Sequence, residues 1–421
     1  MAVTESQVVA TELERVIPKI RVLFERDKRF FAHIKTKDVE KISYRQMRVP
    51  LEINPGGNFQ YFNADGGDLG RGSGPIWDKA VLQAVFMSEG IEYTKLAQWA
   101  TDDARKAVQN AVRRLTATAL EELMRQLDAQ LMTNGSGVVG TLSVVSTSGG
   151  VDTYTLGTDG FGARLVRDQQ NIQLFDSTLA TLKGSGQITQ WDVVNKQIQV
   201  TPAIAGATAG DLLVTAGIGA PASLPGLFGV AYHDSNASTG TWLGFSRSAT
   251  PQIRASNVNA SSAALSLPLP RLAINQIGNR VGIDNDYSPN AWMHPCQVQA
   301  YEEIGQLITV LNMMPSDKEL DLYYGKKGGN PKMQMAGAPV QASFNWDMTR
   351  IDFSADEVWG WGETLPLGFY KTDGRNIFEI RSASGGVAAA DIFYMVVGRQ
   401  AFVNNPAAVS YISSLAVPSG Y

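Results

Sequence analysis

The chain has 421 residues, of which 44% are apolar and 18% charged, and its formal net charge is −4. This length allows two or three compact units, and the composition is typical of a folded soluble protein. No stretch approaches the ~18 uninterrupted apolar residues of a membrane helix, and the first residues lack the pattern of a secretory signal. Cys296 is the single cysteine and cannot form an intrachain disulfide. These features argue against a membrane protein, a disulfide-stapled secreted protein and a chain that binds nucleic acid through its overall charge.

Positive charge is concentrated near the N-terminus. Eleven Lys or Arg and four acidic residues lie between Arg15 and Arg48, so this segment carries about +7 while the whole chain is negative. We define residues 1–43 as a basic arm. Two readings remain open, a solvated arm with helical pieces or an arm that faces an acidic partner such as packaged nucleic acid. The candidate contact residues of the arm are Arg15, Lys19, Arg21, Arg26, Lys28 and Arg29.

Residues 44–94 have the pattern of a long β-hairpin. Arg48 to Ile53 alternates as a strand, Ala80 to Thr94 is a second strand-like run, and the segment between them is crowded with Gly and Asn. A two-stranded hairpin is marginally stable alone and exposes unpaired edges, so we expect it to lie on a neighbouring subunit. The candidate contact residues are Ile53, Asn54, Phe59, Tyr61, Phe62, Arg71 and Trp77.

Residues 95–140 are dominated by one long helix. From Asp102 to Thr133 the chain has no Gly or Pro, and apolar residues recur every three or four positions, which predicts a helix of roughly 48 Å. Asn134 and Gly135 then supply the residue types that end helices. Exposed charges on this helix are candidates for contacts between or beneath subunits, namely Arg113, Arg114, Glu121, Glu122 and Arg125.

The remaining chain alternates short strands and helices. Residues 141–217 are poor in charge and rich in Gly, Thr and Val, which predicts a small inserted β-barrel or sandwich. Within 218–330, helices are expected at Pro268–Ile283 and His294–Met314, and 331–421 holds several strand-like runs. Helices and antiparallel strands in this order predict an α+β fold without regular βαβ alternation.

No convincing catalytic or cofactor motif is present. Gly135 to Gly140 matches the spacing of a dinucleotide fingerprint but follows a helix and opens no new one. His294 and Cys296 lack a second pair of zinc ligands, and a packed helix entry is the simpler reading. Trp359 and Trp361 could stack on sugars or bases but more often such residues pack in a core. We therefore expect no enzymatic activity, no metal and no cofactor.

The order of these parts resembles the Hong Kong 97-type major capsid proteins of tailed double-stranded DNA bacteriophages. The hairpin resembles the extended loop of that family and the long helix its spine helix. AWMHPCQVQAYEEIGQLITVLN resembles the helix of the axial domain, MQMAGAPVQAS a family strand entry, and FVNNPAAVSYISSL its closing Asn-Pro pattern. The β-rich 141–217 segment departs from the minimal coat and looks like the inserted domain of some relatives.

The resemblance implies a fold with an N-terminal arm, extended loop, spine helix, and peripheral and axial domains. On this basis 95–140 belongs to the peripheral domain, 218–330 is the axial domain, and 331–421 returns to the peripheral domain. It implies self-assembly into pentamers and hexamers of an icosahedral head in the virion, formed in the bacterial host cytoplasm. The implied partners are a separate scaffolding protein, a portal, decoration proteins and non-specifically bound double-stranded DNA.

Two other classes of function remain open. An encapsulin-type nanocompartment shell would share the fold but enclose enzymes, and a β-rich host- or glycan-binding virion protein would fit the Gly/Thr-rich middle. The long central helix argues against the second. Lys–Asn crosslinking between subunits is not expected, because Lys79 is the only lysine between Val49 and Gly90 and lies outside the tip of the loop.

Overall fold

The computed structural model divides the chain into two compact units. Unit 1 comprises residues 1–35, 85–229 and 363–400, and unit 2 comprises 36–84, 230–362 and 401–421. The structure describes residues 30–54, 56–57, 59–61, 65–66, 68, 70–94, 105–157, 160–218, 226–282, 289–311, 334–381 and 387–419. Side chains are not described at 93–94, 105–115, 117–118, 305–311, 381 and 387–389. Of the predicted contact residues, Phe62 and the arm residues 15–29 lie outside the described residues.

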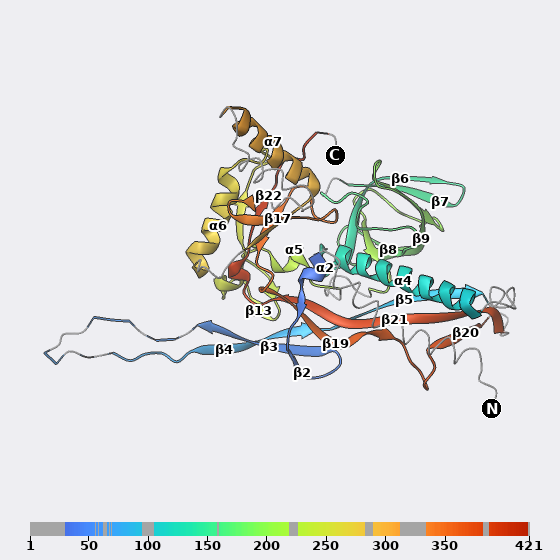
Figure 1. Ribbon diagram of the computed structural model, residues 1–421, viewed down its shortest axis with the longest axis horizontal. Helices are drawn as coiled ribbons and strands as arrows, with labels where there is room; N and C mark the ends of the chain where they lie inside the picture. The colour runs from blue at the N-terminus through green and yellow to red at the C-terminus, as the bar shows by residue number, and fades with distance from the viewer. Residues whose placement is uncertain are drawn as a thin grey trace. The chain divides into compact units, whose positions relative to one another are not determined.

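A long helix packed on a sheet forms one part of unit 1. Helix α4 (Arg105–Gln130) contacts β5 (Val85–Thr94), which pairs antiparallel with β21 (Val387–Val403) (Figure 1). On its other side β21 adjoins β19 (Trp359–Phe369) and β20 (Ile377–Arg381). The buried side chains of α4 include Leu120, Leu123 and Leu127, which confirms the apolar face expected from the spacing.

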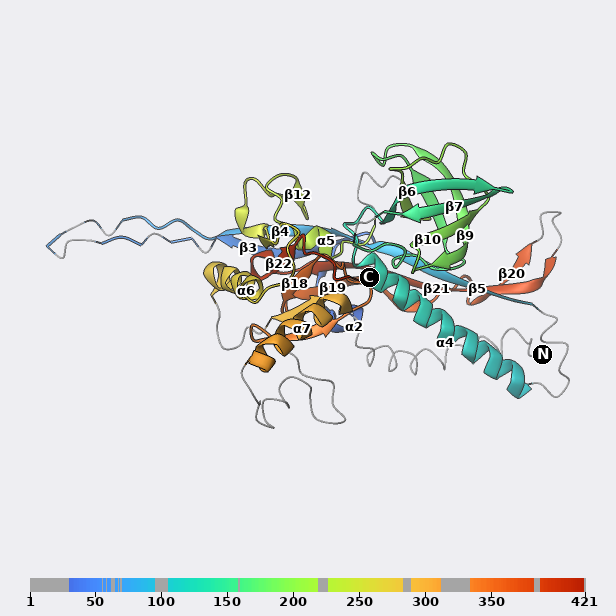
Figure 2. The same cartoon turned by 90° about the horizontal axis from the view of Figure 1, so that it is seen from above.

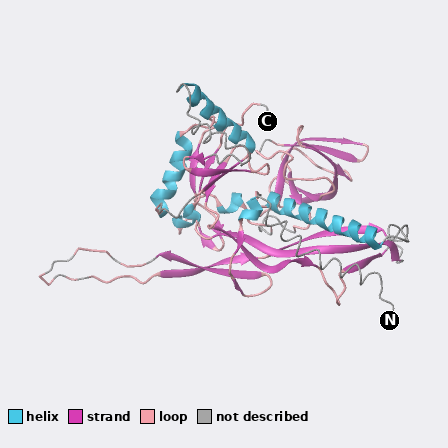
Figure 3. Ribbon diagram, viewed as in Figure 1, coloured by secondary structure: helices cyan, strands magenta, loops and turns pink. Residues whose placement is uncertain are grey.

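Six strands form a closed barrel in the same unit. Their order around the barrel is β10-β7-β6-β11-β8-β9. The strands are β6 (Val138–Ser148), β7 (Val151–Leu156), β8 (Asn171–Phe175), β9 (Leu182–Asp192), β10 (Gln197–Thr201) and β11 (Leu212–Thr215). Alternating residues such as Ile198 and Val200 are fully buried, as the period-two pattern requires. Closure leaves no free sheet edge, so this barrel is complete within the chain (Figure 3).

A polar network is buried in the barrel around Asp152. Its carboxylate accepts hydrogen bonds from Thr147 Oγ1 at 2.5 Å, from the Tyr154 hydroxyl at 2.7 Å and from the Ile204 amide at 2.7 Å. Burial acts to raise the pKa of Asp152, but these hydrogen bonds hold it below its usual value. Burial also raises the pKa of Tyr154, whose hydroxyl donates to Asp152. The buried Asp152 carboxylate is therefore satisfied by hydrogen bonds from within the barrel.

A six-stranded sheet forms the core of unit 2, in the order β14-β22-β18-β15-β17-β16. These strands are β14 (Ser256–Asn259), β22 (Ser410–Ser413), β18 (Ile351–Ser354), β15 (Asn290–Met293), β17 (Ala338–Ala342) and β16 (Gln334–Met335). Helices α6 (Pro268–Val281) and α7 (Pro295–Leu311) pack on it, and α6 contributes Ala273 and Ile277 to the core (Figure 2).

The short elements of unit 2 complete its packing. They are β2 (Glu40–Lys41), α5 (Val230–His233), β12 (Thr241–Trp242), β13 (Phe245–Ser246) and the 3-10 turns Pro251–Ile253 and Pro406–Ala408. The second turn is the predicted Asn-Pro motif, where the Asn405 side chain accepts a hydrogen bond from the Ala407 amide at 3.1 Å. Two further short elements precede them in the chain, α2 (Phe30–His33) in unit 1 and β1 (Lys35–Thr36). Mixed helices and mostly antiparallel strands confirm the α+β class.

The predicted hairpin is present, but its return strand differs from the expected one. β3 (Gln46–Asn54) pairs with β4 (Ile76–Gln83), whereas the second half of the expected Ala80–Thr94 strand is β5, which pairs with β21. Ala84 separates β4 from β5. Its amide donates a hydrogen bond to the Arg45 carbonyl at 2.9 Å, which closes the base of the hairpin. Period-two alternation continues across this point, so the sequence pattern could not show the change of partner.

Candidate assembly surface

The hairpin of unit 2 is anchored at its base and exposed at its distal end. Met47, Ala80 and Leu82 at the base are buried, whereas most residues beyond Pro50 and before Lys79 are exposed or half-buried. Figures 1 and 2 show two extended segments that continue past β3 and β4. Backbone and side-chain bonds still join these segments, including Gly57 N to Ser73 O at 2.7 Å. The described residues of the distal hairpin are therefore joined by hydrogen bonds but bury little apolar surface.

Local turns and a bulge shape this projection. The register shifts between Glu52 and Asn54, which leaves Ile53 as an extra residue opposite Trp77 and Ile76. The Asn54 side chain accepts a hydrogen bond from the Gly56 amide at 2.9 Å and turns the chain out of β3. Pro50 has no amide hydrogen to donate, which suits a two-stranded element with a free edge.

Large aromatic side chains project into solvent from the hairpin. Phe59 is 86% exposed, Tyr61 92% and Trp77 65%. Phe59 and Tyr61 contact each other edge to face, with ring centroids 5.5 Å apart. Arg71 is also exposed. Clustered exposed aromatic residues are unfavourable in water and are enriched at protein interfaces, so this is the strongest candidate contact surface in the described residues.

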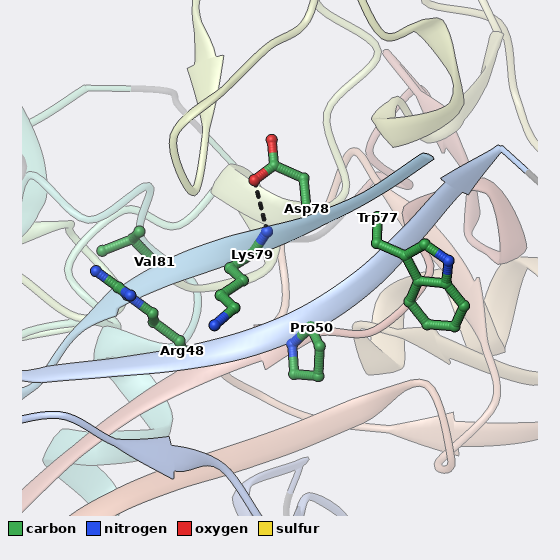
Figure 4. Close-up of a pocket in the computed structure, with 6 residues that line it drawn as sticks. All are labelled: Arg48, Pro50, Trp77, Asp78, Lys79 and Val81. Atoms are coloured by element: carbon green, nitrogen blue, oxygen red, sulfur yellow. Dashed lines mark hydrogen bonds between the residues drawn. The ribbon is translucent and has the colours of Figure 1, made fainter. Parts of the chain in front are cut away.

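One face of the hairpin is hollowed. A cavity of about 560 Å³ is lined by Arg48, Pro50, Trp77, Asp78, Lys79 and Val81, which Figure 4 shows along the two strands. The register places Arg48 opposite Val81 and Pro50 opposite Lys79, so these four share a face with Trp77. We call this face the hairpin groove.

The groove face carries two basic residues, Arg48 and Lys79, and two acidic ones, because the register places Glu40 opposite Arg48 and Glu52 opposite Trp77. Lys79 Nζ lies 3.8 Å from Glu40 Oε2, and both side chains are more than half exposed. The guanidinium of Arg48 makes no ion pair among the described residues. Asp78 belongs to the other face, where its carboxylate accepts a hydrogen bond from the Lys79 amide at 2.7 Å (Figure 4). Sequence analysis missed Arg48 and Lys79 as groove residues, because only the strand register brings them together.

The charges predicted on the long helix are arranged mainly along α4 itself. Glu122 accepts a hydrogen bond from Gln126 at 3.2 Å and lies 3.7 Å from Arg125, while Glu121 is exposed. Burial raises the pKa of Glu89 on β5, and the negative charge of Glu122 raises it further. The side chains of Arg113 and Arg114 lie outside the described residues. A role of these helix charges between subunits stays a prediction.

The histidines and tryptophans that could suggest chemistry have structural roles. His233 is fully buried, accepts a hydrogen bond from Trp242 Nε1 at Nδ1 (3.0 Å), and donates from Nε2 to the Ala401 carbonyl (3.1 Å). Trp359 and Trp361 are buried, and His294 Nδ1 accepts the Cys296 amide at 3.1 Å, which confirms core packing and a packed helix entry. In the described part of the chain no three His, Cys, Asp or Glu side chains gather as metal ligands.

Comparison with known proteins identifies the fold. No family model matches this sequence, and no curated protein matches it. The chain is similar to the cyanophage A-1(L) capsid protein with a TM-score of 0.50 and 10% identity, over 91% of this chain and 90% of that one. It is also similar to the capsid of a native GTA particle (TM-score 0.44, 11% identity, 93% and 91% covered). A third similar structure is the SrpI encapsulin of Synechococcus elongatus PCC 7942, with a TM-score of 0.42 and 8% identity, over 92% of this chain and 87% of that one.

The fold assignment rests on the cyanophage protein, because its likeness extends over nearly the whole of both chains at a TM-score of 0.50. In the described residues no helix is both long and apolar enough to cross a membrane. The chain therefore has the phage capsid-protein fold that its resemblance to the Hong Kong 97-type major capsid proteins predicted.

Proposed function

We propose that this chain is the major capsid protein of a tailed double-stranded DNA bacteriophage. Copies assemble as pentamers and hexamers of an icosahedral head, in the host cytoplasm, and remain as the virion shell. The observation that carries the proposal is the capsid fold combined with a projecting hairpin whose aromatic residues have no core of their own. Head-to-tail contacts between identical copies form closed rings, and many weak contacts together stabilise a shell.

The finer anatomy belongs to the same proposal. The barrel at 138–215 is an insertion relative to the minimal coat, and 218–330 supplies the axial domain at the centre of each capsomer. A separate scaffolding protein, a portal and decoration proteins are the expected partners. The basic arm contacts scaffold first and packaged DNA later, through salt-sensitive phosphate contacts.

The test is assembly of the purified chain, alone and with the phage's scaffolding protein. Negative-stain microscopy and size-exclusion chromatography should show shells, with nucleic acid inside heads from infected cells. Particles that contain enzyme cargo and no genome would identify a nanocompartment instead. Monomers or small oligomers under all these conditions would contradict the proposal.

Replacing the distal hairpin tests its role directly. We would replace Ile53–Ile76 by Asn-Gly, which joins Glu52 to Trp77, already paired, through a two-residue type I′ turn. The variant should fold, because the buried base is retained, but it should not form shells. Far-ultraviolet circular dichroism and thermal unfolding check folding, and Val194→Ser in an exposed barrel turn is the control that should still assemble. Normal shells from the shortened variant would show that the distal hairpin is not needed to hold neighbouring copies together.

The arm is tested by neutralising Arg15, Lys19, Arg21, Arg26 and Lys28 together. Shell formation without scaffold should be unchanged, whereas scaffold recruitment or DNA filling should fall and become less sensitive to salt. Scaffold content by gel densitometry and DNA content by absorbance give the readout. Unchanged values for both would contradict a role for the arm in either contact.

A further inference from the structure

The β14 end of the unit 2 sheet is built from segments of the chain that contain no acidic residue. The sequence from Ser235 to Gly282 has four arginines and no Asp, Glu or Lys, and 401–421 has no charged side chain. These two segments pack together, because β14 pairs in parallel with β22 and α6 contacts both strands. This region therefore carries four positive charges in a chain whose net charge is −4.

Three of these arginines are linked in series through their own backbone. The Arg254 guanidinium donates from Nε to the Arg247 carbonyl at 2.7 Å, and the Arg280 guanidinium donates from Nη1 to the Arg254 carbonyl. Arg280 also donates to the Ser256 hydroxyl at 3.3 Å and to the Pro251 carbonyl at 3.0 Å. We call Arg247, Arg254 and Arg280 the arginine cluster.

The hydrogen-bond acceptors of the arginine cluster are neutral carbonyls and a hydroxyl. Arg247 is only 4% exposed and donates to the carbonyls of Ser235 and Tyr232 at 2.9 and 2.8 Å. None of the three arginines forms an ion pair within the described ranges. Asp234 precedes the segment, but its carboxylate interacts with the charge of Arg350. The positive charge of the cluster is therefore not balanced in the described part of unit 2.

The charges of the cluster repel one another. Burial lowers the pKa of Arg247 and of Arg280, and the charge of Arg254 lowers both pKa values further. A guanidinium nevertheless stays protonated in proteins, so the repulsion persists. Carbonyl acceptors need only neutral donors, so the hydrogen bonds alone do not account for three cations here. A bound anion would offset their repulsion.

Unused donors of the cluster remain available to such an anion. Nη1 of Arg254 and Nε of Arg280 have no hydrogen-bond partner among the residues that the structure describes, and Arg254 is partly exposed and Arg280 exposed. Ser238, whose carbonyl accepts from Arg254 at 3.4 Å, is exposed beside them. Arginine together with serine is a common donor set for phosphate. A carboxylate has two oxygens for one guanidinium, whereas a phosphate can accept from several, so three neighbouring arginines favour phosphate.

We propose that the arginine cluster binds a phosphate group through Arg254 and Arg280, with the buried Arg247 adding positive charge. The phosphate belongs either to a free polyphosphate or to the backbone of nucleic acid, since both present the same oxygens. The inference goes beyond the proposed function, because this site requires only the folded chain and is separate from the basic arm.

Binding to the unassembled full-length chain tests the site, with the arm neutralised as above so that it does not contribute. The probes are inorganic tripolyphosphate, measured by calorimetry, and a short DNA duplex, measured by fluorescence anisotropy at the same ionic strength. Arg254→Gln with Arg280→Gln should weaken binding roughly tenfold or more, because charge-assisted hydrogen bonds are lost. Arg271→Gln is the matched control, because it lies nine residues from Arg280 on α6, on the opposite side of the helix, and should leave affinity unchanged.

The two probes distinguish the sources of the phosphate. Binding of tripolyphosphate alone identifies a free polyphosphate, whereas cluster-dependent binding of the duplex identifies nucleic acid. Circular dichroism and thermal unfolding check that the variants fold, and Arg280→Lys, which keeps the charge but lacks the planar fork, should give intermediate affinity. This variant replaces the double variant if the latter does not fold.

Three results would overturn the inference. They are no binding of either probe, equal loss of affinity in the cluster variant and in Arg271→Gln, and tighter binding of polyglutamate than of both phosphate probes. The last result would identify an acidic protein segment as the occupant. Shell assembly by the wild-type chain is a separate measurement, so each of these results leaves the proposed function intact.

Discussion

Charged residues of unit 2 lie in two contrasting settings, the interior and the hairpin. In the interior, Arg350 forms a two-pronged ion pair with Asp352, with Nε 2.8 Å from Oδ1, and its guanidinium lies 4.0 Å from the Tyr411 ring centroid. On the hairpin, Arg48 and Lys79 are solvated and weakly paired. The interior charges are fixed by the fold, whereas the hairpin charges are available to a partner. Stability and assembly should therefore depend on different residues.

The first prediction concerns the interior pair and has the largest expected effect. Arg350→Met should lower the free energy of unfolding by about 3–5 kcal/mol, because it leaves the buried Asp352 carboxylate without its cation. Trp346 would still donate to Asp352 at 2.9 Å but carries no charge. Urea denaturation of the unassembled chain measures the change. A loss below about 1 kcal/mol would show that this pair contributes no more than a surface pair.

The second prediction uses the buried His233. Burial lowers its pKa to about 3, and the Trp242 donor fixes Nδ1 as an acceptor. The unfolded chain binds a proton below ~6.5, whereas the folded protein does not until about 3. Stability should therefore fall with acidification across this window, by about 1.4 kcal/mol per pH unit from this group. His233→Gln should remove that slope, and an unchanged slope in urea denaturation from pH 6.5 to 4 would contradict the assignment.

The third prediction concerns Asp234, whose Oδ1 is buried without a hydrogen-bond partner. Burial raises the pKa of Asp234, the charge of Asp352 raises it further, and Arg350 opposes the shift. A raised folded pKa makes ionisation costly, so stability declines as pH rises from ~4 through the folded pKa. Asp234→Asn should raise the free energy of unfolding by roughly 1–3 kcal/mol at pH 8 and by nothing near pH 3. A destabilised variant at pH 8 would contradict this.

Sequence patterns predicted the regular elements better than the surfaces that they build. The apolar spacing of the long helix, the Pro-headed helix at 295 and the hairpin exposed to solvent all follow from local chemistry. The exchange of partners at Ala84 does not, because β4 and β5 form one continuous alternating run in the sequence. The hairpin groove depends on strand register, which joins residues distant in the chain, such as Pro50 and Lys79.

The fourth prediction has the smallest effect on stability and separates the two settings most directly. Lys79→Met and Trp77→Ala should each change the free energy of unfolding by less than about 0.5 kcal/mol, because both side chains are largely exposed. Both should nevertheless reduce the yield of shells at a fixed protein concentration, Trp77→Ala more strongly, because a large aromatic anchor contributes more to an interface than a solvated charge. Val194→Ser on the barrel, at a position that is 88% exposed, should alter neither property. If Trp77→Ala assembled like the control, Trp77 would not be needed for shell assembly. The interior and hairpin residues would then differ only in their effect on the free energy of unfolding.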